Sequence, residues 1–178
     1  MKFKELFFIS ILSISLILMS FRLPSNLQKK VAKEIKIAFS LEDFLLEEVI
    51  IPDSLNTKVE IKFHESKLFK INTNSNLIGY AYLDKAPSKT DEFDYLVLFD
   101  TDLIIKKAKV LVYREDYGGE IGSKRWLKQF IGKSNVDRLI YEKDIVAISG
   151  ATISANSMTI AVNKLLQSID KLHQLKVL

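Results

Sequence analysis

The chain has 178 residues, of which 48% are hydrophobic and 27% are charged, and its formal net charge is +4. This composition is sufficient for one packed domain with an appendage, and it excludes an intrinsically disordered chain. The absence of cysteine excludes disulfides, thiolate zinc sites, iron–sulfur clusters and a cysteine nucleophile. Because the lysines are scattered and form no dense basic block, we expect no nucleic-acid partner.

An apolar run lies at the N-terminus. Leu6 to Phe21 is sixteen residues long, contains only serine as a polar type, and is flanked by Lys4 and Arg22. As a helix it would be about 24 Å long, and snorkelling of the flanking cations can narrow the gap to a hydrocarbon core of about 30 Å. A cleaved signal peptide, a retained anchor and a buried core helix all fit such a run. We expect the anchor, because Leu18 and Ser20 make a poor cleavage site; either exported form places the domain outside the cytoplasm.

Two short amphipathic patterns follow in residues 23–56. Apolar residues recur at helical spacing from Val31 to Phe39 and again from Leu41 to Val49, with Lys and Glu between them, and Pro52 ends the second pattern. We predict one or two amphipathic helices that connect the membrane segment to the domain. Their apolar stripe packs either on the domain, which we favour, or on a partner subunit.

From residue 57 the hydrophobic period changes to two. Val59, Ile61 and Phe63 alternate with charged residues, which is typical of a half-buried strand. Four further segments rich in β-branched and aromatic residues are predicted strands: Leu68–Ile71, Leu77–Leu83, Tyr95–Phe99 and Ile104–Tyr113. The linking segments, residues 84–94 and 100–102, are short enough for an antiparallel meander.

The chain ends with a helical pattern. A short apolar run, Ile145–Ile148, predicts a buried strand, and apolar residues then recur at spacings of three and four from Met158 to Leu172. Strands first and helix last predict an α+β fold with a mostly antiparallel sheet and packed helices. We place this domain at residues 57–178, after a membrane segment at residues 1–22 and a helical connector at residues 23–56.

The loop before the last helix consists of small and hydroxyl-bearing residues, Ser149-Gly150-Ala151-Thr152-Ile153-Ser154. Such residues are ordinary helix caps. They also let a phosphate approach the backbone and meet the unpaired N–H groups of a helix N-terminus. Local chemistry alone leaves both interpretations open.

A second stretch, residues 114–122, interrupts the strand pattern with three glycines. It is either a plain turn or a place where a flat ring lies against the backbone, since glycine suits both. Ser123 is a predicted N-cap of a short helix that carries Trp126 and ends at Gly132. Trp126 is either a core residue only or a core residue that also borders a ligand.

These two stretches resemble the FMN-binding domain family, which includes the FMN-carrying C subunit of sodium-pumping NADH:quinone reductase and the G subunit of the Rnf complex. Ser149-Gly150-Ala151-Thr152 is similar to the family's flavinylation motif, and residues 113–133 resemble its segment along the flavin. A weaker likeness extends back to about residue 58. In the family, the threonine oxygen of the motif is joined to the phosphate of FMN, which implies that Thr152 is the attachment residue.

The resemblance implies a membrane-associated flavoprotein on the extracytoplasmic (periplasmic) side of a bacterial cytoplasmic membrane. A Mg-dependent flavin transferase would attach the FMN, and the chain would exchange electrons with redox partner proteins of a membrane chain. It would be an electron carrier or a subunit of an oxidoreductase complex and not a stand-alone enzyme. The implied phosphate-binding residues are Ser149, Gly150, Ala151 and Ser154, and the implied ring-lining residues are Glu115, Gly118, Gly119 and Trp126.

One position departs from the family pattern. Flavin transferases usually find Asp three residues before the motif serine, whereas this chain has Val146 there. A scaffold or binding module that holds FMN weakly or not at all is therefore the alternative. A flavin enzyme with its own substrate lacks an evident acid/base pair, and His64 and His173 have no metal-ligand spacing, so we expect neither a catalytic residue nor a metal.

Overall fold

The computed structural model describes residues 24–63, 67–74 and 76–178 of the chain. The predicted membrane segment, residues 1–22, lies outside these residues. Within the described part of the chain, no helix has both the length and the hydrophobicity that crossing a bilayer requires.

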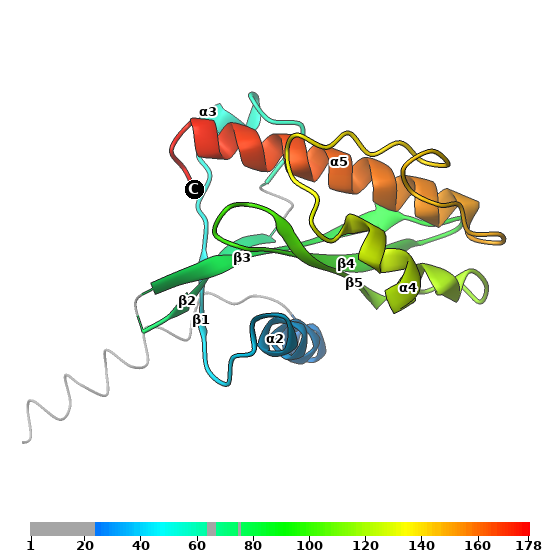
Figure 1. The fold of residues 1–178 in the computed structure, drawn as a ribbon, viewed down its shortest axis with the longest axis horizontal. Helices are drawn as coiled ribbons and strands as arrows, with labels where there is room; N and C mark the ends of the chain where they lie inside the picture. Colours follow the sequence, from blue (N-terminus) through cyan, green and yellow to red (C-terminus); the bar gives the residue numbers. More distant parts are fainter. Residues whose placement is uncertain (1–23, 64–66, 75) are drawn as a thin grey trace, which may run out of the picture.

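Five antiparallel strands form one sheet in the order β1-β2-β3-β4-β5, so every strand pairs with its neighbour along the chain (Figure 1). The strands are β1 (Leu45–Glu48), β2 (Lys67–Thr73), β3 (Asn76–Pro87), β4 (Glu92–Phe99) and β5 (Ile105–Val112). The predicted antiparallel meander is therefore confirmed. Strands β2 to β4 each contain a predicted segment, and β5 lies one residue inside the predicted segment Ile104–Tyr113 at each end.

Two helices sandwich this sheet (Figure 1). Helix α5 (Thr152–Gln174) covers one face and helix α2 (Ser25–Phe39) covers the other. Because neighbouring side chains of a strand point to opposite faces, Tyr95 and Val97 of β4 join the core under α5, whereas Leu96 and Leu98 join the core over α2. Strand β4 is consequently buried on both sides, and the α+β fold with packed helices is confirmed.

Short helical turns connect and flank these layers. They are α3 (Asp53–Asn56), η1 (Gly119–Gly122), α4 (Lys124–Leu127) and η2 (Lys128–Phe130). The predicted N-cap of α4 is confirmed, because the Ser123 side chain accepts a hydrogen bond from the backbone N–H of Trp126. The last helix is confirmed and begins at Thr152, inside the segment predicted as the loop before it. Its apolar stripe is buried at Met158, Val162, Leu165, Leu166, Ile169 and Leu172.

The helix predicted over residues 41–49 is wrong. Leu45–Glu48 is strand β1, an edge strand that pairs antiparallel with β2, and Leu46 lies opposite Ile71. Over so few residues, spacings of three and four also fit an irregular edge strand with one partly buried side chain. The preceding pattern is confirmed as helix α2, with Val31 and Ile35 buried.

The strand predicted from residue 57 to residue 63 is also wrong, although its alternation of burial is present. Ile61 and Phe63 are buried, but their backbone N–H groups donate to side chains, those of Ser168 and Asn56. The segment therefore packs against α5 and does not extend the sheet. A hydrophobic period of two shows only that one side of a segment is buried. Here the surface that buries it is helix α5 and not a neighbouring layer of the sheet.

Two further boundaries differ from the predictions. Strands β3 and β4 extend through the predicted linker 84–94, leaving only residues 88–91 as a turn between them. The run Ile145–Ile148 is a loop with one isolated bridge at Ile145, and Val146 is 66% exposed. Of the four residues, Ile145 is buried in the core and Ile148 is partly buried against it, so the apolar composition indicates burial for only part of the run.

Candidate functional site

Thr152 is the first residue of helix α5, and its side chain is exposed. Ala151 stands at the N-cap position and supplies no side-chain hydrogen bond. The first bond of the helical i−4 pattern is that from Ala155 N–H to Ala151 C=O, at 2.9 Å. The amides of Thr152, Ile153 and Ser154 precede it, so this helix end presents N–H groups and a positive dipole end beside the threonine hydroxyl.

A cleft of about 470 Å³ opens beside Thr152. Its walls come from the loop before α5, from the end of β5 and from the β3–β4 turn. The lining residues are Lys89, Tyr113, Glu115, Tyr117, Gly150, Ala151, Thr152, Ile153 and Ser154. This volume lies within the range of about 300–1,000 Å³ that small-molecule and cofactor sites occupy.

The inner wall of this cleft is polar. The hydroxyls of Tyr113 and Ser154 lie 3.1 Å apart, within hydrogen-bonding distance, and Ser154 is only 3% exposed. Ser154, expected as a phosphate ligand, is thus placed at the cleft but is already bonded to a tyrosine. That tyrosine was not among the expected site residues.

Residues 114–122, here called the glycine bend, pack directly on the loop before α5. Gly118 has φ of +81°, in the left-handed region that favours glycine. A Cβ at this position would lie 2.9 Å from the Cβ of Ala151 and 3.0 Å from the carbonyl oxygen of Gly150. Gly119, in contrast, has no such neighbour within 4 Å. The structure therefore brings the two stretches identified in the sequence into contact.

A second cleft of about 810 Å³ lies beside residues 146–149, and both Ser149 and Trp126 line it. Trp126 is 6% exposed, packs edge-on against Phe130, and donates from Nε1 to the carbonyl oxygen of Val146 at 2.7 Å. The Val146 N–H in turn donates to the Gln129 side chain at 2.9 Å. Trp126 is thus a core residue that fixes the loop as well as lining a cleft.

Glu115 anchors the turn between β3 and β4. Its carboxylate accepts hydrogen bonds from the Ser88 hydroxyl at 2.6 Å, the Thr90 N–H at 2.7 Å and the Thr90 hydroxyl at 2.9 Å. These bonds favour the charged form and lower the pKa of Glu115 to about 2. At neutral pH this side chain is therefore a fixed negative charge in the wall of the Thr152 cleft.

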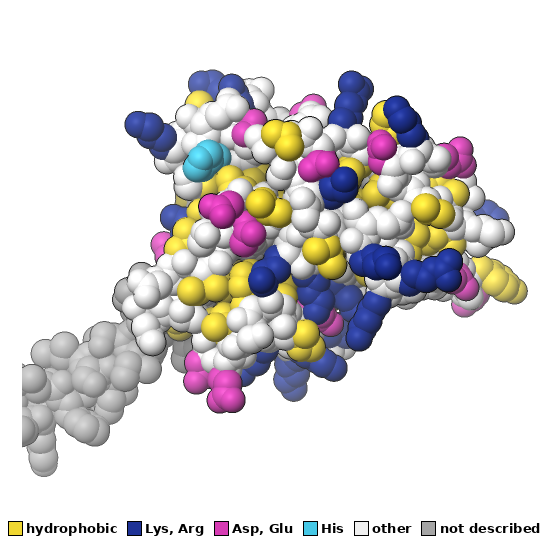
Figure 2. Space-filling model, viewed as in Figure 1, with side chains coloured by type: hydrophobic (Ala, Val, Ile, Leu, Met, Phe, Trp, Pro, Cys, Tyr) yellow, Lys and Arg dark blue, Asp and Glu magenta, His cyan; other side chains and the backbone are white. Residues whose placement is uncertain are grey.

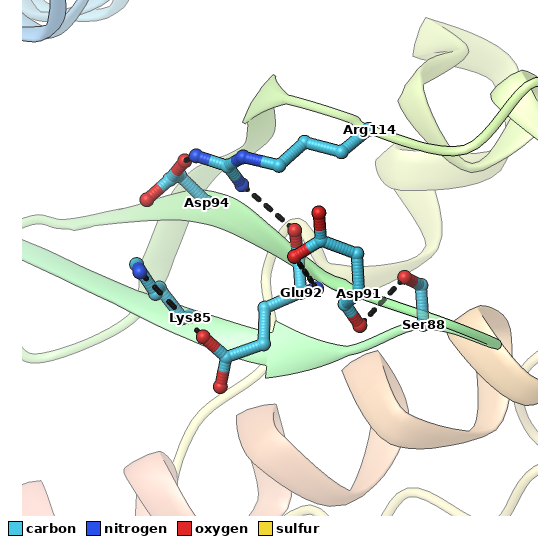
Figure 3. A network of polar contacts seen from close by, with 6 residues as sticks. All are labelled: Lys85, Ser88, Asp91, Glu92, Asp94 and Arg114. Atoms are coloured by element: carbon cyan, nitrogen blue, oxygen red, sulfur yellow. Dashed lines mark hydrogen bonds and ion pairs between the residues drawn. The ribbon is translucent and has the colours of Figure 1, made fainter.

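The neighbouring residue Arg114 binds to strand β4 (Figure 3). Its guanidinium lies 2.5 Å from the carboxylate of Asp94 and donates to the carbonyl oxygen of Glu92 at 2.7 Å. Asp94 is 6% exposed, so this pair is largely shielded from water. Arg114 thus binds the start of the glycine bend to β4, and Glu115 binds it to the β3–β4 turn.

Seven of the nine expected site residues line one of these two clefts, whereas Gly118 and Gly119 line neither. Gly150, Ala151, Thr152, Ser154 and Glu115 line the first cleft, and Ser149 and Trp126 line the second. The residues that sequence reasoning missed are Lys89, Tyr113, Tyr117 and Ile153. Tyr113 and Tyr117 are aromatic residues in the polar stretch that leads to Gly118, and that signal could have identified them.

No metal site accompanies the clefts in the part of the chain that is described, since it contains no group of acidic and histidine side chains able to hold an ion. His173 is exposed near the end of α5, and His64 lies outside the described residues.

Residues 89–167 match the family model of the FMN-binding domain. The chain thus contains an FMN-binding domain that begins in the β3–β4 turn and ends within α5, and the resemblance inferred from the two stretches is confirmed. A search of curated proteins found no match. The matched region contains every expected site residue, whereas α2 and strands β1 to β3 precede it.

The residues of the Thr152 cleft fit an FMN group. A phosphate monoester needs N–H donors and a nearby cation, which the first turn of α5 and Lys89 provide. A planar ring needs backbone without side chains and an aromatic neighbour. Tyr117 lines the cleft and is 85% exposed, so it supplies the aromatic neighbour. Gly119 does not line the cleft, but it lies two residues further along the chain and its Cβ position is open.

Proposed function

We propose that the chain is a membrane-associated flavoprotein that carries electrons through FMN esterified to Thr152 on the extracytoplasmic side of the membrane. The observation that carries this proposal is the exposed hydroxyl of Thr152 at the mouth of a cleft, within a domain of the FMN-binding family. The chain acts as a carrier or as a subunit of an oxidoreductase complex, and its partners are redox proteins of a membrane chain.

The residues of the cleft have separate roles in this proposal. The amides of the first α5 turn and the Lys89 ammonium bind the phosphate, and Gly150 and Ala151 leave space for it. Gly118, Gly119 and Trp126 shape the backbone along the ring, and Glu115 holds the wall in place. Bound FMN supplies one- and two-electron transfer, and the protein supplies its orientation and electrostatic environment.

A covalent link suits an exported carrier. A protein outside the cytoplasm cannot recover lost FMN from the cytoplasmic pool, so an ester to Thr152 retains it without deep burial. The cleft is open, which leaves a ring edge accessible to partner proteins. A Mg-dependent flavin transferase forms the bond from a flavin dinucleotide: the Thr152 oxygen gives up its proton and attacks the flavin-side phosphorus, and the phosphoanhydride breaks to release the nucleoside monophosphate. The exposed position of Thr152 gives that enzyme access.

The test is flavin fluorescence of the denatured chain after expression with a flavin transferase. Thr152→Val should abolish the fluorescent band, and Thr152→Ser, which keeps a hydroxyl, should retain part of it. Thr101→Val, an exposed threonine in the β4–β5 turn, is the matched control and should label as the wild type does. A fluorescent Thr152→Val band of wild-type intensity would rule out attachment at this residue.

A scaffold module that does not carry covalent FMN is the second candidate, and Val146 favours it, because flavin transferases usually find Asp at this position. Intact mass spectrometry of protein from cells with an active transferase separates the two. The mass of the bare chain supports the scaffold, and a mass increased by one esterified FMN supports the carrier.

A further inference from the structure

Helix α2 and strand β5 carry a large net positive charge. Together they contain seven lysines and one acidic residue, Glu34, a surplus of six positive charges against +4 for the whole chain. Figure 2 shows dark blue side chains gathered around α2 on the lower side of the molecule.

Three of these lysines form a row on the outer side of α2. Lys29, Lys33 and Lys36 are exposed and follow one another at spacings of four and three, which places them on one helix face. Ile37, four residues after Lys33, is 58% exposed beside them. No ion pair to these three lysines occurs within the described residues, in contrast to Lys107, which lies 2.5 Å from Glu34.

The position of α2 in the chain identifies the surface that this face meets. The apolar run ends at Phe21, and α2 begins at Ser25. Four residues span at most about 14 Å when fully extended, so the start of α2 stays near any bilayer that holds the run. The lysines are spread along the helix, which favours a helix lying along a membrane surface over one standing on it.

We propose that the face of α2 formed by Lys29, Lys33, Lys36 and Ile37 docks on the anionic lipid headgroups of the membrane. The lysines bind the headgroup phosphates and Ile37 enters the interface, as in helices that lie on membranes. This proposal shares only the membrane attachment with the proposed function. It is independent of the flavin.

Docking in this orientation has a consequence for the site. Helices α2 and α5 cover opposite faces of the sheet (Figure 1). Docking through α2 would therefore hold the Thr152 cleft, at the start of α5, away from the lipid surface. An electron partner then reaches the cleft from the aqueous side or from an adjacent membrane protein, and the bilayer does not block it.

The absence of cysteine allows a direct test in the full chain. A spin label at Ile37→Cys reports proximity to a lipid whose headgroup carries chelated nickel, in nanodiscs of phosphatidylcholine with or without phosphatidylglycerol. A label at Ile160→Cys, an exposed position on α5, is the control. We expect nickel to relax the label at position 37 several-fold more strongly in the anionic discs, and high salt should remove the difference. The label at position 160 should not change.

Charge variants separate a specific face from a general charge effect. Combined Lys29→Gln, Lys33→Gln and Lys36→Gln should abolish the anionic enhancement at position 37. Combined Lys143→Gln, Lys164→Gln and Lys171→Gln, which removes the same charge from exposed positions, should leave it intact. Two results would overturn the proposal. One is equal relaxation of the label at position 37 in anionic and neutral discs, which is expected if this face binds an acidic protein. The other is an equal effect of the two triple variants on that relaxation.

Failure of the membrane attachment is recognised separately. If the chain enters neither kind of disc, the anchor is wrong, and flotation with anionic and neutral vesicles then decides the docking face. The docking face is supported if the chain binds anionic vesicles and only the first triple variant loses this binding. It is overturned if the chain does not bind anionic vesicles.

Discussion

Gly118 lies directly against Ala151: a Cβ on the glycine would come within 2.9 Å of the Cβ of the alanine. The two residues are more than thirty positions apart in the sequence, one in the glycine bend and the other in the loop before α5. A contact this close leaves no room for a side chain at position 118. The position of the Thr152 hydroxyl thus depends on a glycine in another segment.

Gly118→Ala should therefore destabilise the protein and reduce FMN attachment. The left-handed backbone and the clash with Ala151 together predict a loss of about 2–4 kcal/mol in the free energy of unfolding. Urea unfolding of the chain measures the stability, and flavin fluorescence on a denaturing gel measures the attachment.

Two other glycines are matched controls for this prediction. Gly150 has φ of +80° but no neighbour within 4 Å of its added Cβ, so Gly150→Ala should lose only about 1–2 kcal/mol. Gly119 has neither constraint, and Gly119→Ala should stay within about 0.5 kcal/mol of the wild type. A loss for Gly119→Ala equal to that for Gly118→Ala would contradict the role given to this contact.

Val146→Asp should increase the rate of flavin attachment several-fold, because it restores the acid that flavin transferases usually find. The side chain is 66% exposed, and the backbone is held by Trp126 and Gln129 whatever side chain is present, so the substitution should not disturb the loop. The measurement is intact mass against time with a purified flavin transferase.

Ala147→Asp places the same charge on the adjacent exposed residue and should leave the rate unchanged. An equal increase for both variants would mean that negative charge near the loop acts without positional specificity.

Arg114→Met should cost more stability than Asp94→Asn. Removing the guanidinium leaves a buried carboxylate without its cation, a loss of about 2–3 kcal/mol after allowing for the partial exposure of Arg114. The amide of Asp94→Asn can still accept a hydrogen bond from Arg114, which limits its loss to about 1 kcal/mol. Thermal unfolding of both variants gives the comparison.

The exposed pair of Lys85 and Glu92, at 3.5 Å, is the control, and Lys85→Met should change the stability by at most about 1 kcal/mol. If Asp94→Asn costs as much as Arg114→Met, the buried carboxylate is not the source of the effect.

Sequence patterns predicted the parts of this fold that repeat over many residues. The apolar stripe of α5 runs from Met158 to Leu172 and was identified correctly, as were the β-branched segments of β2 to β5. Short patterns failed, because a few apolar residues fit more than one structure. β1 showed helical spacing, and the run at Ile145 showed the composition of a buried strand.

The same distinction applies to the site. The loop before α5 and the glycine bend were both identified from local chemistry and family likeness, and they do lie in contact. The bond between Tyr113 and Ser154 and the bonds of Glu115 to the β3–β4 turn join residues far apart in the chain. Such partners depend on how the sheet and α5 pack, which no local pattern encodes.

The hydrogen bonds of Glu115 predict a local, pH-dependent change in the β3–β4 turn. Because folding lowers the pKa of this carboxyl from 4.5 to about 2, its stabilising contribution is present above pH 4.5 and is lost as the pH falls towards 2. Nuclear magnetic resonance should show Glu115 titrating near pH 2, together with a shift of the Thr90 amide that it binds. Glu115→Gln should reproduce the acid form of the turn at neutral pH, with faster hydrogen exchange of the Thr90 amide. Glu120→Gln, an exposed acid in η1, should leave that amide unchanged, and a Thr90 amide insensitive to Glu115→Gln would show that the carboxylate does not hold the turn.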